Sequence, residues 1–248
     1  MIEGKKIYFA SDFHLGTPNY KESRVREDKI VAWLNTIRSD VAELYLVGDL
    51  FDFWYEHKYT IPKGFVRLQG KIAEFTDAGI PVHVFTGNHD MWMFDYFPKE
   101  LGVILHRETI TRTWNGKKFL IGHGDGLGPG DKGYKVLKKV FANKFCQWAF
   151  ARLHPNFSFW LATKSSQKSR LHTALEDEKY LGDENEWLAI YCKERLKIEH
   201  FDYFIFGHRH FPINISVGEN SKYINLGEWI NYQTYGVFDG SDVELLKF

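Results

Sequence analysis

The chain has 248 residues, of which 44% are hydrophobic and 26% are charged, values typical of a soluble globular protein with one large core. Lysine plus arginine and aspartate plus glutamate number 32 each, so the molecule lacks the net positive charge of non-specific nucleic-acid binders, and nucleic acid is excluded as an expected partner. Only Cys146 and Cys192 are present, without a CxxC pair, which favours a reducing compartment and two buried thiols.

The amino terminus runs into a β-rich stretch without a basic and then apolar leader, and no run of about 18 apolar residues occurs in the chain. We therefore expect a cytoplasmic protein that is peripheral to the inner membrane at most and does not span it. No pattern in the sequence indicates an obligate protein partner.

Short β-rich runs alternate with amphipathic helical patterns in the first half of the chain. The runs cover residues 6–11, 44–47, 82–86 and 118–121, and helical periodicity covers 24–38 and 62–77. A run at 203–206 is followed by close-spaced strands at 213–217, 223–226, 235–238 and 243–246, whose short turns favour antiparallel pairing. This order predicts an α/β fold in which two sheets form a sandwich flanked by helices.

The stretch 132–170 does not follow that alternation. It contains nine lysines or arginines, no acidic residue, and eight aromatic residues counted from Tyr134 to Trp160. Leu137, Phe141, Phe145 and Trp148 recur at helical spacing within a helix expected at 135–153. We expect one domain over 1–248, with a helical cap inserted at about 128–175 and a following helix, ending near 197, that returns the chain to the core.

Two interpretations of the apolar cap stay open at this point. Its aromatic side chains either pack the cap onto the main domain, or they bind acyl chains while basic side chains extend toward anionic headgroups. These basic residues are Lys135, Lys138, Lys139, Lys144 and Arg152. The absence of acidic residues in an aromatic-rich segment favours an anionic amphiphile as its ligand.

Five β-rich runs end on residues that can bind a metal ion: Asp12 and His14, then Asp49, Asn88, His123, and finally His208 with His210. Residues two apart in an extended strand point to the same side, so Asp12 pairs with His14 and His208 with His210. Glycine precedes four of these sites, and we expect it to let the backbone turn sharply. Carboxylate, amide and imidazole donors without cysteine favour Mn²⁺, Fe²⁺ or Zn²⁺.

The blocks Asp12-x-His14, Gly48-Asp49, Gly87-Asn88-His89-Asp90, Gly122-His123 and Gly207-His208-x-His210 resemble, in order, the signature of the calcineurin-like metallophosphoesterases. The resemblance implies that Asp12, His14 and His210 hold one metal ion, that Asn88, His123 and His208 hold the other, and that Asp49 bridges the two. Two such ions activate water for attack on phosphorus. We expect His89 to donate a proton to the leaving group, Asp90 to orient the His89 imidazole, and Asp125 to lie close to the metal ligands.

One branch of that family, the UDP-2,3-diacylglucosamine hydrolases of lipid A synthesis, is similar to this chain in three blocks: 11–16, 48–54, and 123–127 followed by 131–134. The similarity implies two ions, with Mn²⁺ the expected metal, and hydrolysis of the pyrophosphate of a lipid-linked nucleotide sugar to UMP and 2,3-diacylglucosamine 1-phosphate. It implies an acyl-chain pocket in the cap and contacts of the substrate with the side chains of Asn88, Asp131, Ser166, Lys168, Arg170 and His208. Well-known members have Arg where this chain has His89, and Thr where it has Arg209.

Two alternatives remain. The first is a generic metallophosphoesterase that acts on another phosphodiester or nucleoside diphosphate derivative, with the apolar surface of the cap wholly buried. The second is a non-catalytic binding module, which would be expected to lack metal ligands, whereas all seven are present.

Overall fold

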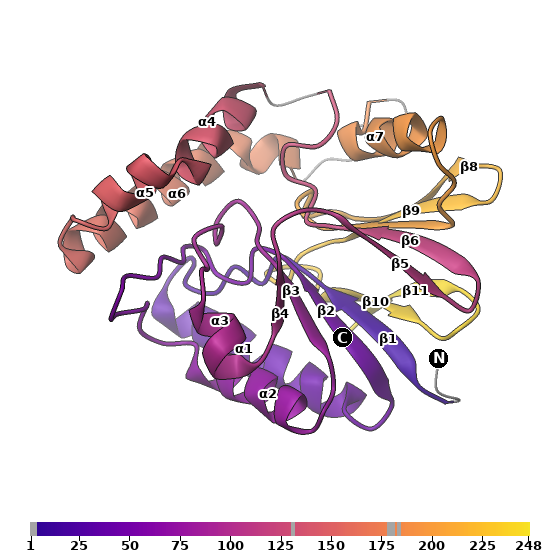
Figure 1. Cartoon of the computed structure of the whole chain (residues 1–248), viewed down its shortest axis with the longest axis horizontal. Coiled ribbons are helices and arrows are strands. Elements are labelled where there is room, and N and C mark those ends of the chain that lie inside the picture. The colour runs from indigo at the N-terminus through magenta and orange to yellow at the C-terminus, as the bar shows by residue number, and fades with distance from the viewer. Residues whose placement is uncertain (1–3, 130–131, 178–181, 183–184) are drawn as a thin grey trace.

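The structure is a computed structural model that describes residues 4–129, 132–177, 182 and 185–248; for 132–133 and 167–177 it describes the backbone and no side chains. Two sheets pack face to face, as expected (Figure 1). The six-stranded sheet has the order β11 (Val243–Lys247), β10 (Thr234–Phe238), β1 (Lys6–Ala10), β2 (Val41–Val47), β3 (Val82–Phe85), β4 (Ile104–His106). The five-stranded sheet has the order β5 (Ile110–Trp114), β6 (Lys117–Ile121), β7 (Tyr203–Phe206), β9 (Ser221–Leu226), β8 (Pro212–Gly218).

Parallel strands form the centre of both sheets. Strands β1, β2, β3 and β4 run parallel, as do β6, β7 and β9, so their carboxyl ends meet at one edge of the sandwich. The outer pairs β5–β6, β8–β9 and β10–β11 are antiparallel, and β10 also pairs antiparallel with β1. The expected antiparallel pairing of the late strands is therefore confirmed for β8–β9 and β10–β11, while β9 adds a parallel pairing with β7.

The two faces of β1 contribute to different parts of the core. Ile7 and Phe9 pack between the sheets, whereas Tyr8 and Ala10 pack under the helices on the outer face. Such a strand is apolar throughout because it is covered on both sides. The helices α1 (Tyr20–Ile37), α2 (Val66–Asp77) and α3 (Tyr96–Leu101) cover the six-stranded sheet, and α7 (Trp187–Leu196) covers the other.

Helix α1 shows how the sequence specifies this packing. Ile30, Trp33, Leu34 and Ile37 follow the helical repeat and are all buried, and the side chain of Asn19 caps the first turn by accepting a hydrogen bond from the Glu22 amide. Helix α7 buries Leu188, Ala189 and Cys192 and so returns the chain to the core, as expected.

Three further helices lie beside the carboxyl ends of the strands, outside the sandwich: α4 (Lys132–Ala142), α5 (Lys144–Phe150) and α6 (Pro155–Asp177) (Figure 1). The helix expected at 135–153 is interrupted at Asn143, whose side chain caps α5 through the amides of Phe145 and Cys146. The prediction of two buried thiols is wrong for Cys146, which is only partly buried, and is confirmed for Cys192. No helix among the described residues is both long and apolar enough to cross a bilayer.

Candidate metal centre

The carboxyl ends of five strands bring the predicted ligands together. Asp12 and His14 follow β1, Asp49 follows β2, Asn88 follows β3, His123 follows β6, and His208 and His210 follow β7. The first sheet thus supplies four ligands and the second sheet three. Side chains gathered at this edge lie where α/β sheets place their functional sites.

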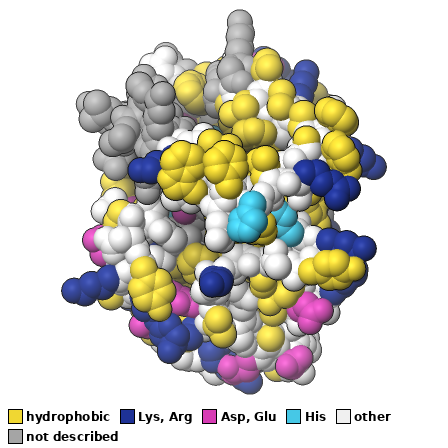
Figure 2. Space-filling view, turned by 90° about the vertical axis from the view of Figure 1, so that its left-hand side faces the viewer, with side chains coloured by type: hydrophobic (Ala, Val, Ile, Leu, Met, Phe, Trp, Pro, Cys, Tyr) yellow, Lys and Arg dark blue, Asp and Glu magenta, His cyan; other side chains and the backbone are white. Residues whose placement is uncertain are grey.

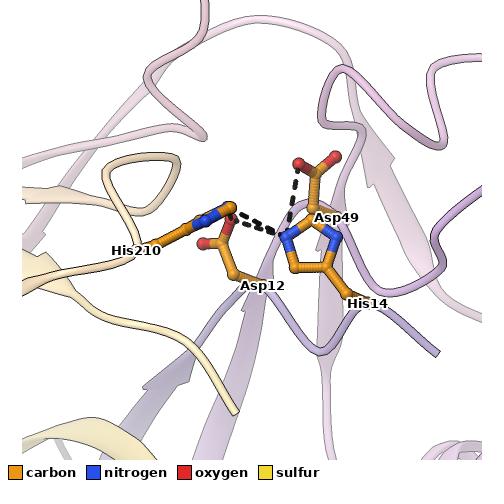
Figure 3. A group of neighbouring side chains, drawn as sticks. All are labelled: Asp12, His14, Asp49 and His210. Atoms are coloured by element: carbon orange, nitrogen blue, oxygen red, sulfur yellow. Dashed lines mark hydrogen bonds and ion pairs between the residues drawn. The ribbon is translucent and has the colours of Figure 1, made fainter. Parts of the chain in front are cut away.

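Asp12, His14, Asp49 and His210 form one group, with one ligand atom of each lying within 4.8 Å of the others (Figure 3). The His14 Nε2 atom lies 3.6 Å from Asp12 Oδ1, 3.9 Å from Asp49 Oδ2 and 3.0 Å from His210 Nε2. Asp12 Oδ1 lies 3.4 Å from His210 Nε2. These four side chains therefore aim donor atoms at a common point.

Asn88, His123 and His208 form a second group next to the first. The Asn88 Oδ1 atom lies 3.2 Å from His123 Nε2 and 3.0 Å from His208 Nδ1. Asp49 Oδ2, which faces the first group, also lies 3.3 Å from His123 Nε2. The Asp49 carboxylate therefore lies between the two groups.

The bonding of the two buried carboxylates fits bound cations. In each, one oxygen accepts a backbone hydrogen bond: Asp12 Oδ2 from the His208 amide at 3.0 Å and Asp49 Oδ1 from the His89 amide at 2.8 Å. The other oxygens, Asp12 Oδ1 and Asp49 Oδ2, are buried and have no hydrogen-bond partner. A buried charged oxygen without a partner is costly unless a cation meets it.

The imidazole of His123 is set up as a ligand through Nε2. Its Nδ1 lies 2.9 Å from the Val47 carbonyl oxygen, which can only accept, so Nδ1 carries a proton. Burial acts to lower the pKa of His123, but the Asp49 carboxylate prevails and raises it to about 10. Burial likewise acts to raise the pKa of Asp12, yet the nearby imidazoles of His14 and His210 hold that pKa well below its ordinary value. A divalent ion would replace the proton that now balances these carboxylates.

The backbone at this edge is held in left-handed conformations. Asp12, His14, Asp49, His208 and His210 have φ values of 55°, 45°, 52°, 70° and 51°. Such values are uncommon for residues other than glycine and cluster at functional sites, where the surrounding structure enforces them.

The glycines before the ligands act mainly through their lack of a side chain. Gly48 has a positive φ of 86°, as a sharp turn requires, but Gly87, Gly122 and Gly207 do not have positive φ. A Cβ atom at Gly87 would overlap the Asp49 carboxylate, and one at Gly207 would overlap the Asp12 carboxylate. The expectation of sharp turns is therefore wrong for three of the four positions, where close packing is the reason for glycine.

His89 lies beside the first group, with its ring centroid 5.0 Å from that of His14. Its Nδ1 atom lies 3.0 Å from the carbonyl oxygen of Asp52 and 3.2 Å from the Ser166 hydroxyl of α6. The carbonyl fixes the proton on Nδ1, so Nε2 is the atom left to face a substrate. The contact with the Asp52 carbonyl could not be predicted from the sequence, because a backbone oxygen has no signature in a motif.

Asp90 does not contact the His89 imidazole, which we expected it to orient. Its carboxylate accepts hydrogen bonds from the amides of Gly87 and Leu50 at 2.7 and 2.8 Å, and no contact with the His89 ring is described. Burial, with the nearby Asp49 charge, raises the pKa of Asp90 to about 7. Asp90 thus fixes the turns that carry Asn88 and Asp49, while Asp52 and Ser166 orient His89.

The remaining expected residues fall into two sets. Asp125 is buried and accepts hydrogen bonds from the Tyr134 hydroxyl at 2.6 Å and Lys138 Nζ at 2.5 Å, so it ties α4 to the turn that carries His123. Asp131 lies outside the described residues, and Lys168 and Arg170 lie on α6 in the part whose side chains are not described.

A cavity of about 700 Å³ adjoins His123. Its walls come from the turns after β3 and β6, from the stretch 107–109, and from α4 and α5, with Phe94, Arg107, Lys138 and Lys144 among the lining residues. The site therefore opens onto a space that joins basic, aromatic and apolar side chains, large enough for a substantial organic substrate.

Comparison with known proteins agrees with this geometry. A family model described as calcineurin-like phosphoesterase matches residues 5–212. A protein named UDP-2,3-diacylglucosamine hydrolase from Porphyromonas gingivalis is 38% identical to this chain, over 97% of this chain and 96% of that one. Proteins of the same name from Histophilus somni and Vibrio parahaemolyticus are 28% and 27% identical, over 91% and 89% of this chain and 92% and 89% of their own. The chain therefore belongs to the calcineurin-like phosphoesterase family and is a metal-dependent hydrolase.

Proposed function

We propose that the protein hydrolyses the pyrophosphate of UDP-2,3-diacylglucosamine to UMP and 2,3-diacylglucosamine 1-phosphate, a step of lipid A synthesis. The observation that carries the proposal is the contact of Ser166 on α6 with His89, which brings the cap segment 132–170, a segment without acidic residues, against the metal ligands. The relative from Porphyromonas gingivalis, named for this activity and similar over nearly the whole chain, supports the same substrate.

Asp12, His14 and His210 would hold one divalent ion and Asn88, His123 and His208 the other, with Asp49 shared. Mn²⁺ is the metal we favour, and Fe²⁺ or Zn²⁺ suit the same donors. When bound, the two ions polarise the phosphoryl group and lower the pKa of a water molecule.

The residues of the chain supply the other parts of the reaction. His89 presents Nε2 to the substrate because its Nδ1 is occupied by Asp52 and Ser166, so it can donate a proton to the departing phosphate or stabilise its charge. We propose that Asn88 and His208 also contact the phosphates, and that Asp131, Ser166, Lys168 and Arg170 contact the sugar and its phosphate.

We infer that the chain is one domain with α4–α6 as its cap, and that the cap both packs on the domain and binds lipid. Phe141 and Phe150 contact the ring of Trp92 at centroid distances of 5.1 and 4.8 Å, and Phe159 contacts Phe53 at 5.2 Å. Eight other large apolar side chains of the cap stay exposed: Val136, Leu137, Val140, Phe145, Trp148, Phe157, Trp160 and Leu161. The packing interpretation therefore accounts for only part of the apolar surface.

The exposed part of the cap has the chemistry of a lipid-binding surface. Figure 2 views the end of the molecule at which the cap lies, and hydrophobic side chains gather there with lysine and arginine side chains around them. Nine basic residues and no acidic residue lie between 132 and 170, which suits acyl chains together with anionic headgroups. On this basis we propose that the protein works as a peripheral protein at the cytoplasmic face of the membrane.

The substrate is tested with purified protein, Mn²⁺ and either UDP-2,3-diacylglucosamine or UDP-N-acetylglucosamine, with release of UMP as the readout. We expect UMP from the lipid nucleotide and little from the soluble one, because only the former fills the cap. An active enzyme that cleaves the soluble nucleotide and ignores the lipid one would favour the generic metallophosphoesterase. That alternative has one observation behind it, the cavity beside His123 with polar and basic side chains in its walls.

Membrane association is tested by flotation with vesicles of anionic or zwitterionic phospholipid. We expect binding to the anionic vesicles, and we expect the double change Phe145→Ser and Trp148→Ser to reduce it. The matched control is Ile198→Ser, which removes an apolar side chain that is 77% exposed but lies outside the cap. Equal flotation of all three proteins would contradict a membrane role of the cap.

A further inference from the structure

A buried ion pair joins the beginning of α7 to the turn that carries two of the proposed metal ligands. Glu186 is 0% exposed and Arg209 is 3% exposed. Arg209 Nε lies 2.8 Å from Glu186 Oε1, and Nη2 lies 3.3 Å from Oε2, so the guanidinium contacts both carboxylate oxygens. Two parallel charge-assisted hydrogen bonds of this kind fix the direction of both side chains.

Arg209 stands between His208 and His210, in a turn that needs support from outside. Both histidines have left-handed φ values, 70° and 51°, and the amides of Arg209 and Phe211 donate to the carbonyls of Gly207 and Arg209 at 2.8 and 2.5 Å. Consecutive tight turns with left-handed residues other than glycine persist only where surrounding contacts enforce them. The side chains of His208 and His210 contact the other ligands, whereas that of Arg209 contacts Glu186.

Glu186 provides a fixed point for that contact. It precedes the first residue of α7, its carbonyl accepts the Ile190 amide at 2.9 Å, and its own amide donates to the Gly182 carbonyl at 3.0 Å. Helix α7 is packed through Leu188 and Cys192 onto the same apolar cluster as β7, the strand that leads into the ligand turn. The pair thus links two elements that are already rigid relative to each other.

Net stability is a poor explanation for this pair. A buried ion pair gains little over apolar side chains of similar volume, because taking both charges out of water offsets their attraction. A contact that fixes the orientation of neighbouring metal ligands, in contrast, commonly sets the affinity of the metal. We propose that Glu186 and Arg209 are positioning residues that hold His208 and His210 in their ligand orientation, an inference that rests on the proposed two-metal function.

The decisive variant removes both charges at once. The double variant Glu186→Leu and Arg209→Met removes both charges of this pair together, so the melting temperature of the metal-depleted protein should match or exceed that of the wild type. We expect the dissociation constant for Mn²⁺, measured by calorimetry, to rise by about 10-fold or more. Wild-type affinity for Mn²⁺ in this stable double variant would overturn the proposal.

Single variants separate positioning from folding. Glu186→Gln keeps the shape of the side chain and should weaken Mn²⁺ binding, with kcat at saturating Mn²⁺ falling more than KM changes. The matched control is Glu27→Gln, at a carboxylate that is 3% exposed and accepts the amides of Arg67 and Leu68 at 2.9 and 3.1 Å. It should lower the melting temperature and leave Mn²⁺ affinity unchanged, and an equal loss of affinity in both variants would also overturn the proposal.

The same measurements distinguish failure of the inference from failure of the proposed function. If loss of the pair weakens Mn²⁺ binding but the wild type leaves UDP-2,3-diacylglucosamine intact, the positioning role holds and the substrate assignment is wrong. If the wild type cleaves that lipid and the double variant binds Mn²⁺ as tightly as the wild type does, the substrate assignment holds and the positioning role is wrong. A wild-type chain that binds no divalent ion overturns both.

Discussion

At the scale of single residues, the centre is defined as much by the contacts behind the ligands as by the ligands. Arg26 illustrates this: its side chain is buried and donates to the carbonyls of Phe13 and His14 at 2.7 and 2.6 Å, which supports the turn with Asp12 and His14. Arg209 and Glu186 serve the other ligand turn. A buried arginine side chain thus stabilises each of these two turns that carry ligands.

His89 carries the clearest expectation for catalysis. The change His89→Ala leaves all seven proposed ligands in place, so Mn²⁺ content measured by elemental analysis should stay that of the wild type. Turnover of the lipid nucleotide should fall by about 10² to 10⁴-fold, the usual contribution of proton transfer by a side chain. Full turnover without the imidazole would exclude His89 from the reaction.

The sequence was sufficient to find the side chains that the structure brings together as candidate ligands, and it was insufficient for the residues that support them. Asp12, His14, Asp49, Asn88, His123, His208 and His210 could be found because each follows an apolar run, a local signal. Arg26 looks like any polar residue of an amphipathic helix, and its role arises only when α1 packs beside the turn after β1. The contacts of Asp52 and Glu186 likewise depend on residues far away in the chain.

At the scale of elements, the long central strands and α1 were predictable, and the short edge elements were not. Strands β4 and β5 are partly exposed and α3 has six residues, so none has a long apolar pattern. Helix α2 begins at Val66 and not near 62, because Phe65 has a left-handed φ of 57° and ends the preceding loop. The division of the cap helix at Asn143 follows from a side-chain cap that periodicity does not report.

We expect the contact between α4 and the turn after β6 to matter for hydrolysis of the lipid substrate and not for hydrolysis of a small one. Asp125→Asn weakens the hydrogen bonds with Tyr134 and Lys138 and so loosens α4. The KM for UDP-2,3-diacylglucosamine should rise several-fold, whereas hydrolysis of bis-p-nitrophenyl phosphate, which is too small to need the cap, should change little. The control is Lys193→Met, an exposed position on α7 outside the cap. An equal loss of activity toward both substrates would place Asp125 in the metal centre itself.

The pair of histidines between β3 and β4 should make the folding stability fall in acid. His83 Nδ1 lies 2.9 Å from His106 Nε2, and burial, with the nearby charges of His83 and Arg112, lowers the pKa of His106 to about 4. The unfolded chain therefore binds a proton that the folded chain does not, and stability present above pH 6.5 is lost as pH falls toward 4.

Because His106 is only partly buried, the loss of folding free energy should amount to about 1 kcal/mol. Denaturant unfolding at pH 7.5 and 4.5 measures it, with His106→Gln as the variant in which this part of the pH dependence disappears. An unchanged pH dependence in His106→Gln would assign the acid sensitivity to other groups.

At the scale of the whole molecule, the centre is a connection between the two sheets. Four of its ligands follow strands of the first sheet and three follow strands of the second. A metal ion bound there joins the sheets and stabilises only the folded chain.

The melting temperature should accordingly rise with Mn²⁺ concentration, by an amount equivalent to about 2.7 kcal/mol at a hundred times the dissociation constant of one site. Thermal scans over a Mn²⁺ series measure this, with Mg²⁺ at equal ionic strength as the reference. In Asp49→Ala, which removes the shared carboxylate, two-metal binding and most of the shift should disappear; a shift that persists undiminished would place the stabilising ion elsewhere.

The pairing of β1 with β10 has a consequence for synthesis of the protein. Ile7 lies opposite Phe238, so β1 pairs with a strand that is made much later in synthesis. Until then one side of β1 presents unpaired amides and carbonyls, an edge on which growing polypeptides can associate wrongly. The sandwich is therefore complete only after β10 has been made, and a premature stop codon shortly before residue 234 should give insoluble material and not active enzyme.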